Sequence, residues 1–344
     1  MNYDFVNVCR EELRLCGVHE GEAVAILSSD APDELMGHAG AFMQAAKELG
    51  AAPYHVRVPA TRGKAGGGGW SVGQTPLTDH PAAMAALKEA DIVIDLVFML
   101  FSTEQLEIQA SGTRILLAVE PIDVLSRLLP TTELRERVEF AGDLLASAQS
   151  LRVQHENGTD LVYRLGKYPT ITEYGYTDEP GRWDHWPSGF IFTGAHDDGV
   201  DGTMVLAPGT IIYPFKSHIR TPIRLQVEKG RIVDFSGELD ADLLRDYMDQ
   251  FNDPDGYAIS HIGWGLNEKA RWSAPMMDTR GIGQEGRSFY GNVLFATGPN
   301  QELGGTNASP CHVDIPLHGY SLSLDDRQIV DRGDIVVAEM RPRS

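Results

Sequence analysis

The chain of 344 residues is 42% hydrophobic and 23% charged, a globular composition that can bury a large core, and its length favours two domains. Its net charge of -20 argues against sequence-independent binding of nucleic acid, which requires clustered Lys and Arg side chains. Its longest apolar run, Ile92 to Phe101, is shorter than the roughly 20 residues that cross a bilayer. We therefore expect neither nucleic acid nor a membrane as a partner.

Residues 1–150 alternate strand-like and helix-like segments. The first of these segments lacks the cationic start and apolar core of a signal peptide, so we expect a cytoplasmic protein. The predicted strands are apolar without clean alternation, as in strands covered on both faces, and span residues 23–29, 54–58, 91–97 and 113–120. The predicted helices span residues 32–50, 80–90, 103–112 and 131–150. This alternation predicts an α/β N-terminal domain with a parallel sheet.

A glycine-rich segment, Gly63 to Gly73, interrupts this half. It lacks both the G-K-[ST] ending of a phosphate loop and the G-x-G-x-x-G of a dinucleotide site. We interpret it as a flexible connection, a lid or an oligomer contact.

Residues 151–344 have a different texture, with short strands and few helices. Turn signals stand at Asn157-Gly158, Pro208-Gly209 and Lys229-Gly230, and residues 240–251 form the clearest helix. The three cysteines, Cys9, Cys16 and Cys311, lack C-x-x-C spacing and indicate no zinc finger. Most of the dense clusters of His, Trp, Tyr and Arg lie in this half. We predict an α+β, strand-rich C-terminal domain that carries the chemistry.

His312 and Asp314 stand two residues apart in a predicted strand. Side chains at this spacing point to the same face, so the pair can aim at one metal ion. The alternative is a core histidine followed by a surface aspartate. An imidazole and a carboxylate are two members of the 2-His-1-carboxylate set that binds ferrous iron and leaves coordination positions open.

A third ligand must come from elsewhere in the chain. His318 has the right parity, but a continuous strand would place it about 20 Å from His312. Spacing alone does not decide among the other histidines, of which the best candidates are His218, His185 and His261.

Long motifs supply more than spacing does. The runs "TEYGYTDEPGRWDHWPSGF" (172–190), "ISHIGWGL" (259–266) and "PCHVDIPL" (310–317) resemble the 2,5-dihydroxypyridine 5,6-dioxygenases, iron enzymes of nicotinate breakdown. The resemblance covers nearly the whole chain. It implies one Fe(II) per chain, held by His261, His312 and Asp314, and O2-dependent opening of the ring between C5 and C6 to N-formylmaleamate. It also implies a homo-oligomer.

A more distant resemblance suggests a rival function. The runs "PSGFIFT" (187–193) and "IGWGLN" (262–267) also resemble the thermophilic-type metalloaminopeptidases, which use two metal ions and would make the C-terminal domain aminopeptidase-like. Where those peptidases carry Glu, Glu and His as ligands, this chain has Phe190, His261 and Leu294. These departures leave one metal, which favours the oxygenase over a metal-dependent aminopeptidase or amide hydrolase.

The remaining candidate residues concern the substrate. A flat hydroxypyridine requires apolar walls and a few polar groups, which we assign to Trp183, Tyr290 and Arg287. His185 and Glu173 are the candidates for acid–base catalysis, because ring opening requires a hydroxyl of the substrate to lose its proton. The alternative for each is a hydrogen bond that orients a metal ligand.

Phe101 marks a departure from the family. The dioxygenases carry a His before "SxEQ", where this chain has Phe101. If that His contacts the substrate in the family, we expect either that this chain accepts a close hydroxylated N-heteroaromatic in place of 2,5-dihydroxypyridine or that a proton relay is missing here.

Overall fold

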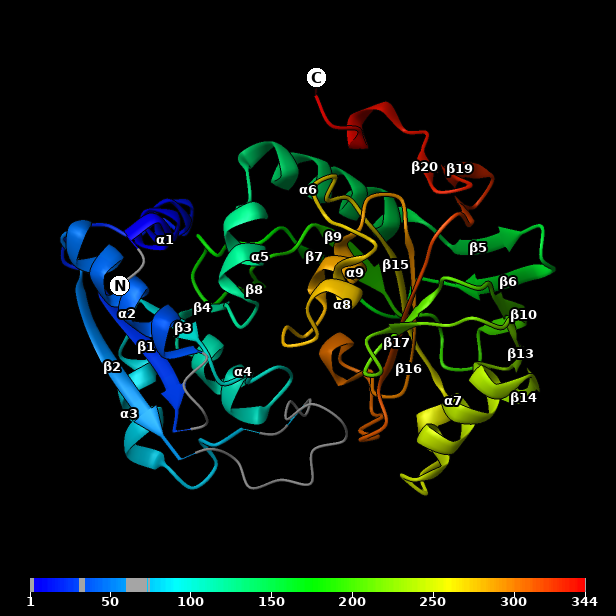
Figure 1. Cartoon of the computed structure of the whole chain (residues 1–344), viewed down its shortest axis with the longest axis horizontal. Helices are drawn as coiled ribbons and strands as arrows, with labels where there is room; N and C mark the ends of the chain where they lie inside the picture. The colour runs from blue at the N-terminus through cyan, green and yellow to red at the C-terminus, as the bar shows by residue number, and fades with distance from the viewer. Residues whose placement is uncertain (1–2, 31–34, 60–72, 74, 344) are drawn as a thin grey trace. The chain divides into compact units, whose positions relative to one another are not determined.

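A five-stranded parallel sheet forms the centre of the N-terminal part of the protein in our computed structural model (Figure 1). Its strands lie in the order β2 (Ala52–Val58), β1 (Ala23–Ser29), β3 (Ile92–Asp95), β4 (Arg114–Leu117) and β8 (Trp183–His185). The structure describes residues 3–30, 35–59, 73 and 75–343, so nearly all of the predicted Gly-rich loop lies outside the described residues. The parallel sheet that the sequence predicts is confirmed.

Helices cover this sheet, and apolar runs explain why. The helices are α1 (Tyr3–Leu15), α2 (Met36–Glu48), α3 (Pro81–Lys88), α4 (Thr103–Ala110) and α5 (Ile122–Arg127). On one face of the sheet, Leu27 and Val93 pack against Leu87 of α3 and Ile108 of α4. Strands β3 and β4 are buried along their whole length, as expected for strands covered on both sides.

Antiparallel sheets build the C-terminal part. An eight-stranded sheet has the order β14 (Arg231–Gly237), β13 (Ile223–Glu228), β10 (Val200–Leu206), β6 (Thr159–Arg164), β5 (Ser150–His155), β18 (Ser321–Leu324), β19 (Arg327–Asp331) and β20 (Asp334–Ile335). A five-stranded sheet has the order β17 (Val313–Leu317), β16 (Val293–Thr297), β15 (Ile259–Gly265), β9 (Phe190–Thr193) and β7 (Ile171–Glu173). A small pair joins β11 (Ile211–Ile212) to β12 (Ser217–His218).

Few helices accompany these sheets. The described helical segments are α6 (Thr132–Ser147), α7 (Leu239–Asp249), α8 (Ala274–Met277) and α9 (Gln284–Ser288), with 3-10 turns η2 (Pro254–Tyr257), η3 (Gln301–Leu303) and η4 (Ala338–Met340). The strand-rich C-terminal half and its clearest helix, α7, are therefore as predicted.

Two of the predicted turns close hairpins and one does not. Asn157-Gly158 joins β5 to β6, and Lys229-Gly230 joins β13 to β14. The turn at Pro208-Gly209 connects β10 to β11, but β10 pairs with β6 and β13 while β11 pairs with β12. Turn residues therefore predict where the chain bends, but they do not predict which strands pair with each other.

The chain divides into two compact units that depart in three places from the single boundary expected near residue 150. The first unit comprises residues 1–131, 173–188 and 280–282, and the second comprises residues 132–172, 189–279 and 283–344. Residues 173–188 join the first unit because β8 pairs with β4, Trp183 beside Ile115. Helix α6 joins the second unit because it packs on β9, and its buried Arg137 donates 2.8 Å to the carbonyl oxygen of Leu266.

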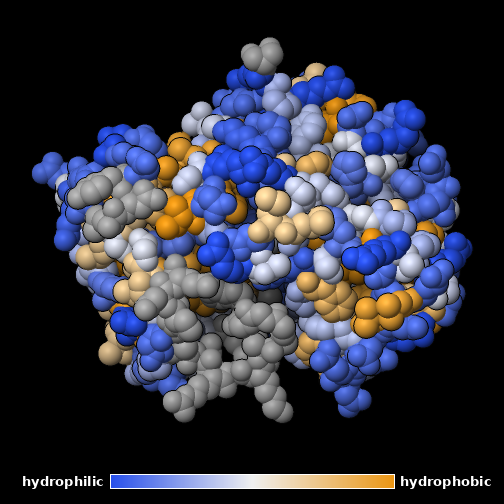
Figure 2. All heavy atoms as spheres, viewed as in Figure 1, coloured by the Kyte–Doolittle hydropathy of each residue, from blue (hydrophilic) through white to orange (hydrophobic). Residues whose placement is uncertain are grey.

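One face of the molecule is shown in Figure 2, where hydrophilic residues prevail. The exposed large apolar side chains include Leu239 of α7 and the neighbours Met276 and Met277 of α8, and some exposed apolar side chains are ordinary for globular proteins. Within the described part of the chain, no helix combines the length and apolarity needed to span a membrane.

Candidate metal centre

Three neighbouring strands of the second unit position the predicted ligands. Asp314 lies on β17 opposite Ala296 of β16, and His312 comes just before β17. His261 lies on β15, in a bulge where the register against β16 shifts between Ile259 and Ile262. A bulge inserts an extra residue and redirects a side chain, so it explains how a strand with apolar neighbours turns His261 toward the other two.

Glycines next to His261 let the strands approach closely. A Cβ at Gly263 would lie 1.8 Å from the carbonyl oxygen of Ile191, and one at Gly265 would lie 2.3 Å from that of Phe289. Side chains at either position would therefore push β9 or α9 away from the strand that carries His261.

The three predicted ligands converge. One ligand atom from each of His261, His312 and Asp314 lies within 4.8 Å of the others. Nε2 of His261 is 3.2 Å from Oδ1 of Asp314, and Nε2 of His312 is 3.3 Å from Oδ2. Oδ1 is buried without hydrogen-bond geometry to any described group. Buried carboxylate oxygens of this kind are usually satisfied, so the cluster has the chemistry of a cation site.

The charges of the cluster favour a bound cation. Burial alone would raise the pKa of Asp314, but the positive charges of His312 and Arg287 hold that pKa well below its usual range. Burial alone would lower the pKa of His261, but the carboxylates of Asp314 and Glu302 raise it to about 9. The cluster therefore binds a proton tightly, and a divalent ion can take the place of that proton.

His312 is oriented for ligation by a backbone carbonyl. Its Nδ1 lies 3.1 Å from the carbonyl oxygen of Thr297, which can only accept a hydrogen bond. The proton of a neutral imidazole therefore sits on Nδ1, and the lone pair of Nε2 points at the cluster.

Arg287 contacts Asp314. Its Nε donates to Oδ2 at 2.7 Å, and its guanidinium lies 4.2 Å from the centre of the Tyr213 ring. The backbone N–H of Tyr213 in turn donates 2.9 Å to the carbonyl oxygen of Asp314. Arg287, predicted as a substrate contact, thus also anchors a candidate metal ligand.

Tyr290 lies in other surroundings within the second unit. It is half-buried beside Gly265, with which it forms a backbone bridge. Burial raises the pKa of its hydroxyl; the charges of Arg137 and Arg341 act to lower it, and those of Asp334 and Glu268 act to raise it. Its predicted role at the substrate stays a prediction.

Four predicted residues belong to the first unit. The ring of Phe101 is 6.5 Å from that of Trp183, which is 6.3 Å from that of His185. Phe101 adopts a left-handed backbone conformation, with φ of 60°, and its N–H donates to Gln105. Glu173 is buried and accepts a hydrogen bond of 3.3 Å from Ser188. Phe101, Trp183 and His185 therefore form one aromatic group.

The other histidines considered as third ligand have other partners. Nε2 of His218 lies 2.9 Å from the carbonyl oxygen of Trp272, and the ring of His318 lies 5.3 Å from that of Trp272. His185 belongs to the first unit. Spacing left open whether His185 or His261 is the third ligand. In the structure it is His261 that lies close to His312 and Asp314.

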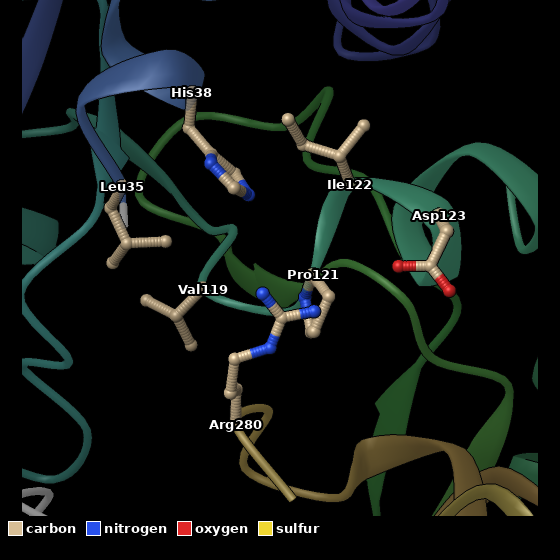
Figure 3. A pocket seen from close by; sticks show the side chains of 7 residues that line it. All are labelled: Leu35, His38, Val119, Pro121, Ile122, Asp123 and Arg280. Carbon is tan, nitrogen blue, oxygen red and sulfur yellow. The ribbon is translucent and has the colours of Figure 1, made fainter. Parts of the chain in front are cut away.

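A cavity of about 180 Å³ in the first unit was not foreseen from the sequence (Figure 3). His38 and Arg280 point toward it, and Leu35, Val119 and Ile122 supply apolar walls. Nε2 of His38 lies 2.9 Å from the carbonyl oxygen of Glu120. None of the predicted site residues lines this cavity.

An α/β unit followed by a strand-rich unit with a buried His-His-Asp cluster has the features of an enzyme with a mononuclear metal site. The chain belongs to the NicX family of 2,5-dihydroxypyridine 5,6-dioxygenases, whose sequence profile matches residues 4–337. It is 47% identical, over 98% of its length and 97% of the relative's, to the 2,5-dihydroxypyridine 5,6-dioxygenase of Pseudomonas putida. The solved structure of the dioxygenase from P. putida KT2440 superposes with a TM-score of 0.96 and 46% identity, covering 99% of each chain. The predicted family is confirmed, and the protein is a dioxygenase.

Proposed function

We propose that one Fe(II) per chain, held by His261, His312 and Asp314, serves the cleavage of 2,5-dihydroxypyridine between C5 and C6. The observation that carries this proposal is the convergence of the three side chains within 4.8 Å. Two imidazoles and a carboxylate suit ferrous iron and leave coordination positions free. When bound, the iron would bring a ring hydroxyl and O2 to adjacent positions.

Two apolar side chains support a single ion. Phe190 and Leu294, which stand where the metalloaminopeptidases carry ligands, are buried together in an apolar cluster with Phe192 and Leu303. Neither can ligate a cation. The aminopeptidase-like ancestry of the fold stays a prediction, whereas a hydrolase that needs two ions to activate water is disfavoured.

The reaction balances without a further reductant. The C5–C6 bond of the dihydroxypyridine breaks and both atoms of O2 enter the product, N-formylmaleamate. Arg287 keeps Asp314 ionised and oriented, and a contact from Arg287 to a substrate oxygen remains part of the proposal. Trp183, Tyr290 and Phe101 are the proposed contacts to the ring.

We assign proton transfer to His185 or Glu173. His185→Gln and Glu173→Gln should each lower kcat by roughly 100-fold or more if the residue moves a proton. His55→Gln is the matched control, because His55 of the same unit bonds Ser28 and has no assigned role. Equal activity in His185→Gln, Glu173→Gln and the control would remove both residues from the mechanism.

The decisive assay joins metal content to oxygen uptake. Protein loaded with Fe(II) without air should contain one iron per chain, and should consume one O2 for each 2,5-dihydroxypyridine. One iron with no uptake would redirect the search to related hydroxylated rings, with Phe101 the first residue to exchange for His. Two metals per chain and amide cleavage without O2 would contradict the proposal. The predicted cytoplasmic location and homo-oligomeric state rest on the sequence alone.

A further inference from the structure

A second carboxylate lies behind His261, on the side away from Asp314. Glu302, on η3, has a side chain only 3% exposed, and its Oε1 is 3.5 Å from Nδ1 of His261. Neither of its carboxylate oxygens has a hydrogen-bond partner among the residues that the structure describes. Burial of an unpaired carboxylate is costly, so its retention calls for a charged partner or a function.

The loop around Glu302 is anchored on both sides. Leu303 packs into the apolar cluster with Phe192 and Leu294. Asn300 and Asn307 pin the loop, because the N–H of Asn300 donates 3.1 Å to the carbonyl oxygen of Asn307, whose own N–H donates 3.0 Å to Oδ1 of Asn300. The Phe192 ring lies 4.8 Å from the ring of His261. Glu302 is therefore held against His261 by packing and by backbone bonds.

The two histidines of the centre differ in what stands behind them. Nδ1 of His312 faces the neutral carbonyl of Thr297 at 3.1 Å. Nδ1 of His261 faces Oγ of Ser260 at 3.2 Å and the carboxylate of Glu302. Ser260 donates its own proton to the carbonyl oxygen of Pro299, so its Oγ can only accept from His261. Both groups behind His261 thus keep the proton on Nδ1.

We propose that Glu302 is a positioning residue of the metal centre: its buried charge, with Ser260, holds the proton of His261 on Nδ1 and makes Nε2 the stronger donor to the metal. A carboxylate behind a ligating imidazole fixes its tautomer and raises its basicity. This inference rests on the proposed ligation by His261. It adds an anion to the centre that spacing and motif matching did not indicate.

The test is a titration of metal-free protein with Co(II). It measures the dissociation constant and the positions of the visible absorption bands of the bound Co(II). Loss of an outer partner costs about 10- to 100-fold in metal affinity. We expect the dissociation constant to rise about 10-fold in Glu302→Gln, which keeps an acceptor but no charge, and about 100-fold in Glu302→Leu. The absorption bands should also shift, because the donor strength of His261 changes.

Controls separate this role from a general packing role. Glu12→Gln, a buried Glu→Gln exchange in the first unit, should leave the Co(II) affinity unchanged. Metal-free Glu302→Gln should unfold at the same temperature as the parent protein, since a packing role would instead lower that temperature. If Glu302→Leu fails to fold, Glu302→Gln alone decides.

Two failures remain distinguishable. If the parent protein and His312→Ala bind Co(II) equally, the proposed metal site itself is wrong. If His312→Ala loses Co(II) while Glu302→Gln and any folded Glu302→Leu bind it with parental affinity and spectrum, the role of Glu302 is contradicted and the site stands.

Discussion

Buried carboxylates are treated differently in the two units. In the first unit, Asp95 accepts the N–H groups of Val97, Phe98 and Met99 at 2.8 to 3.0 Å, which folds the turn after β3. Asp184 accepts two backbone N–H groups from the segment at Tyr174 and a bond of 2.8 Å from Arg182. These carboxylates are saturated by the chain itself, so they are structural.

The second unit leaves carboxylate oxygens unused. Oδ1 of Asp314 and both oxygens of Glu302 are buried without a hydrogen-bond partner among the described residues. Glu12 and Glu22 of the first unit also have one such oxygen each. The other oxygen of Glu22 is paired with Arg114 at 2.7 Å, and burial and the charge of Asp184 raise the pKa of Glu12 well above the ordinary value and keep it neutral. Asp314 has a pKa well below its usual range and stays charged. A charged carboxylate with an unpaired oxygen beside two imidazoles is suited to binding a cation.

The largest effect should come from the ligands. His261→Ala, His312→Ala or Asp314→Ala should each abolish iron binding and oxygen uptake together, because two ligands cannot hold Fe(II) in an open site. His318→Ala is the control, a histidine six residues beyond His312 that contacts only aromatic rings among the contacts described. If any ligand variant kept iron content and oxygen uptake near the parental level, that residue would not be a metal ligand and the contrast between the two units would fail.

Asp95 should show the opposite behaviour, an effect on stability with a defined pH dependence. Burial raises its pKa to about 6 despite three N–H bonds. The folded state therefore holds a proton that the unfolded state releases near pH 4, so the contribution of Asp95 to stability falls as the pH rises through about 6. The full loss is about 3 kcal/mol, of which roughly 1.4 kcal/mol falls between pH 5 and pH 8.

Urea unfolding at pH 5 and pH 8 checks this value. Because the chargeable group is absent in Asp95→Asn, the stability of the parent relative to the variant should decrease by that amount as the pH rises. Asp91→Asn, an exposed exchange near the start of the same strand, should show no such trend. A difference that is flat or of opposite sign would mean that Asp95 is not the titrating group.

The smallest expected effect is that of Arg287→Gln. The exchange removes the 2.7 Å bond to Asp314 and the contact with Tyr213 but leaves all three ligands. We expect metal affinity to fall about 10-fold, as for other partners of metal ligands. Arg224→Gln, at an exposed arginine of β13, is the matched control. Unchanged affinity together with a raised KM would assign Arg287 to the substrate alone.

Apolar runs in the sequence predicted those strands whose burial can be read from their own residues. The apolar runs of β1, β3 and β4 indicated a parallel sheet, because strands buried on both faces lose alternation. Strand β8 escaped notice, since its three residues, Trp183 to His185, carry no apolar run and join the sheet only by pairing with β4. The same pairing carries residues 173–188 into the first unit.

The site divides in the same way. His312 and Asp314 could be paired from spacing, because a strand places alternate residues on one face. His261 could not be chosen by spacing, since a bulge directs its side chain and its partners lie about fifty residues away along the chain. Glu302 gave no signal, because no spacing in the sequence pairs it with His261 and the contact between the two exists only after folding.

Anomalous diffraction at the iron edge from crystals grown with Fe(II) under argon tests the central claim most directly. We predict one iron peak per chain, within ligation distance of Nε2 of His261, Nε2 of His312 and a carboxylate oxygen of Asp314. No peak among these side chains, a peak at other residues, or a second peak beside Phe190 and Leu294 would contradict it.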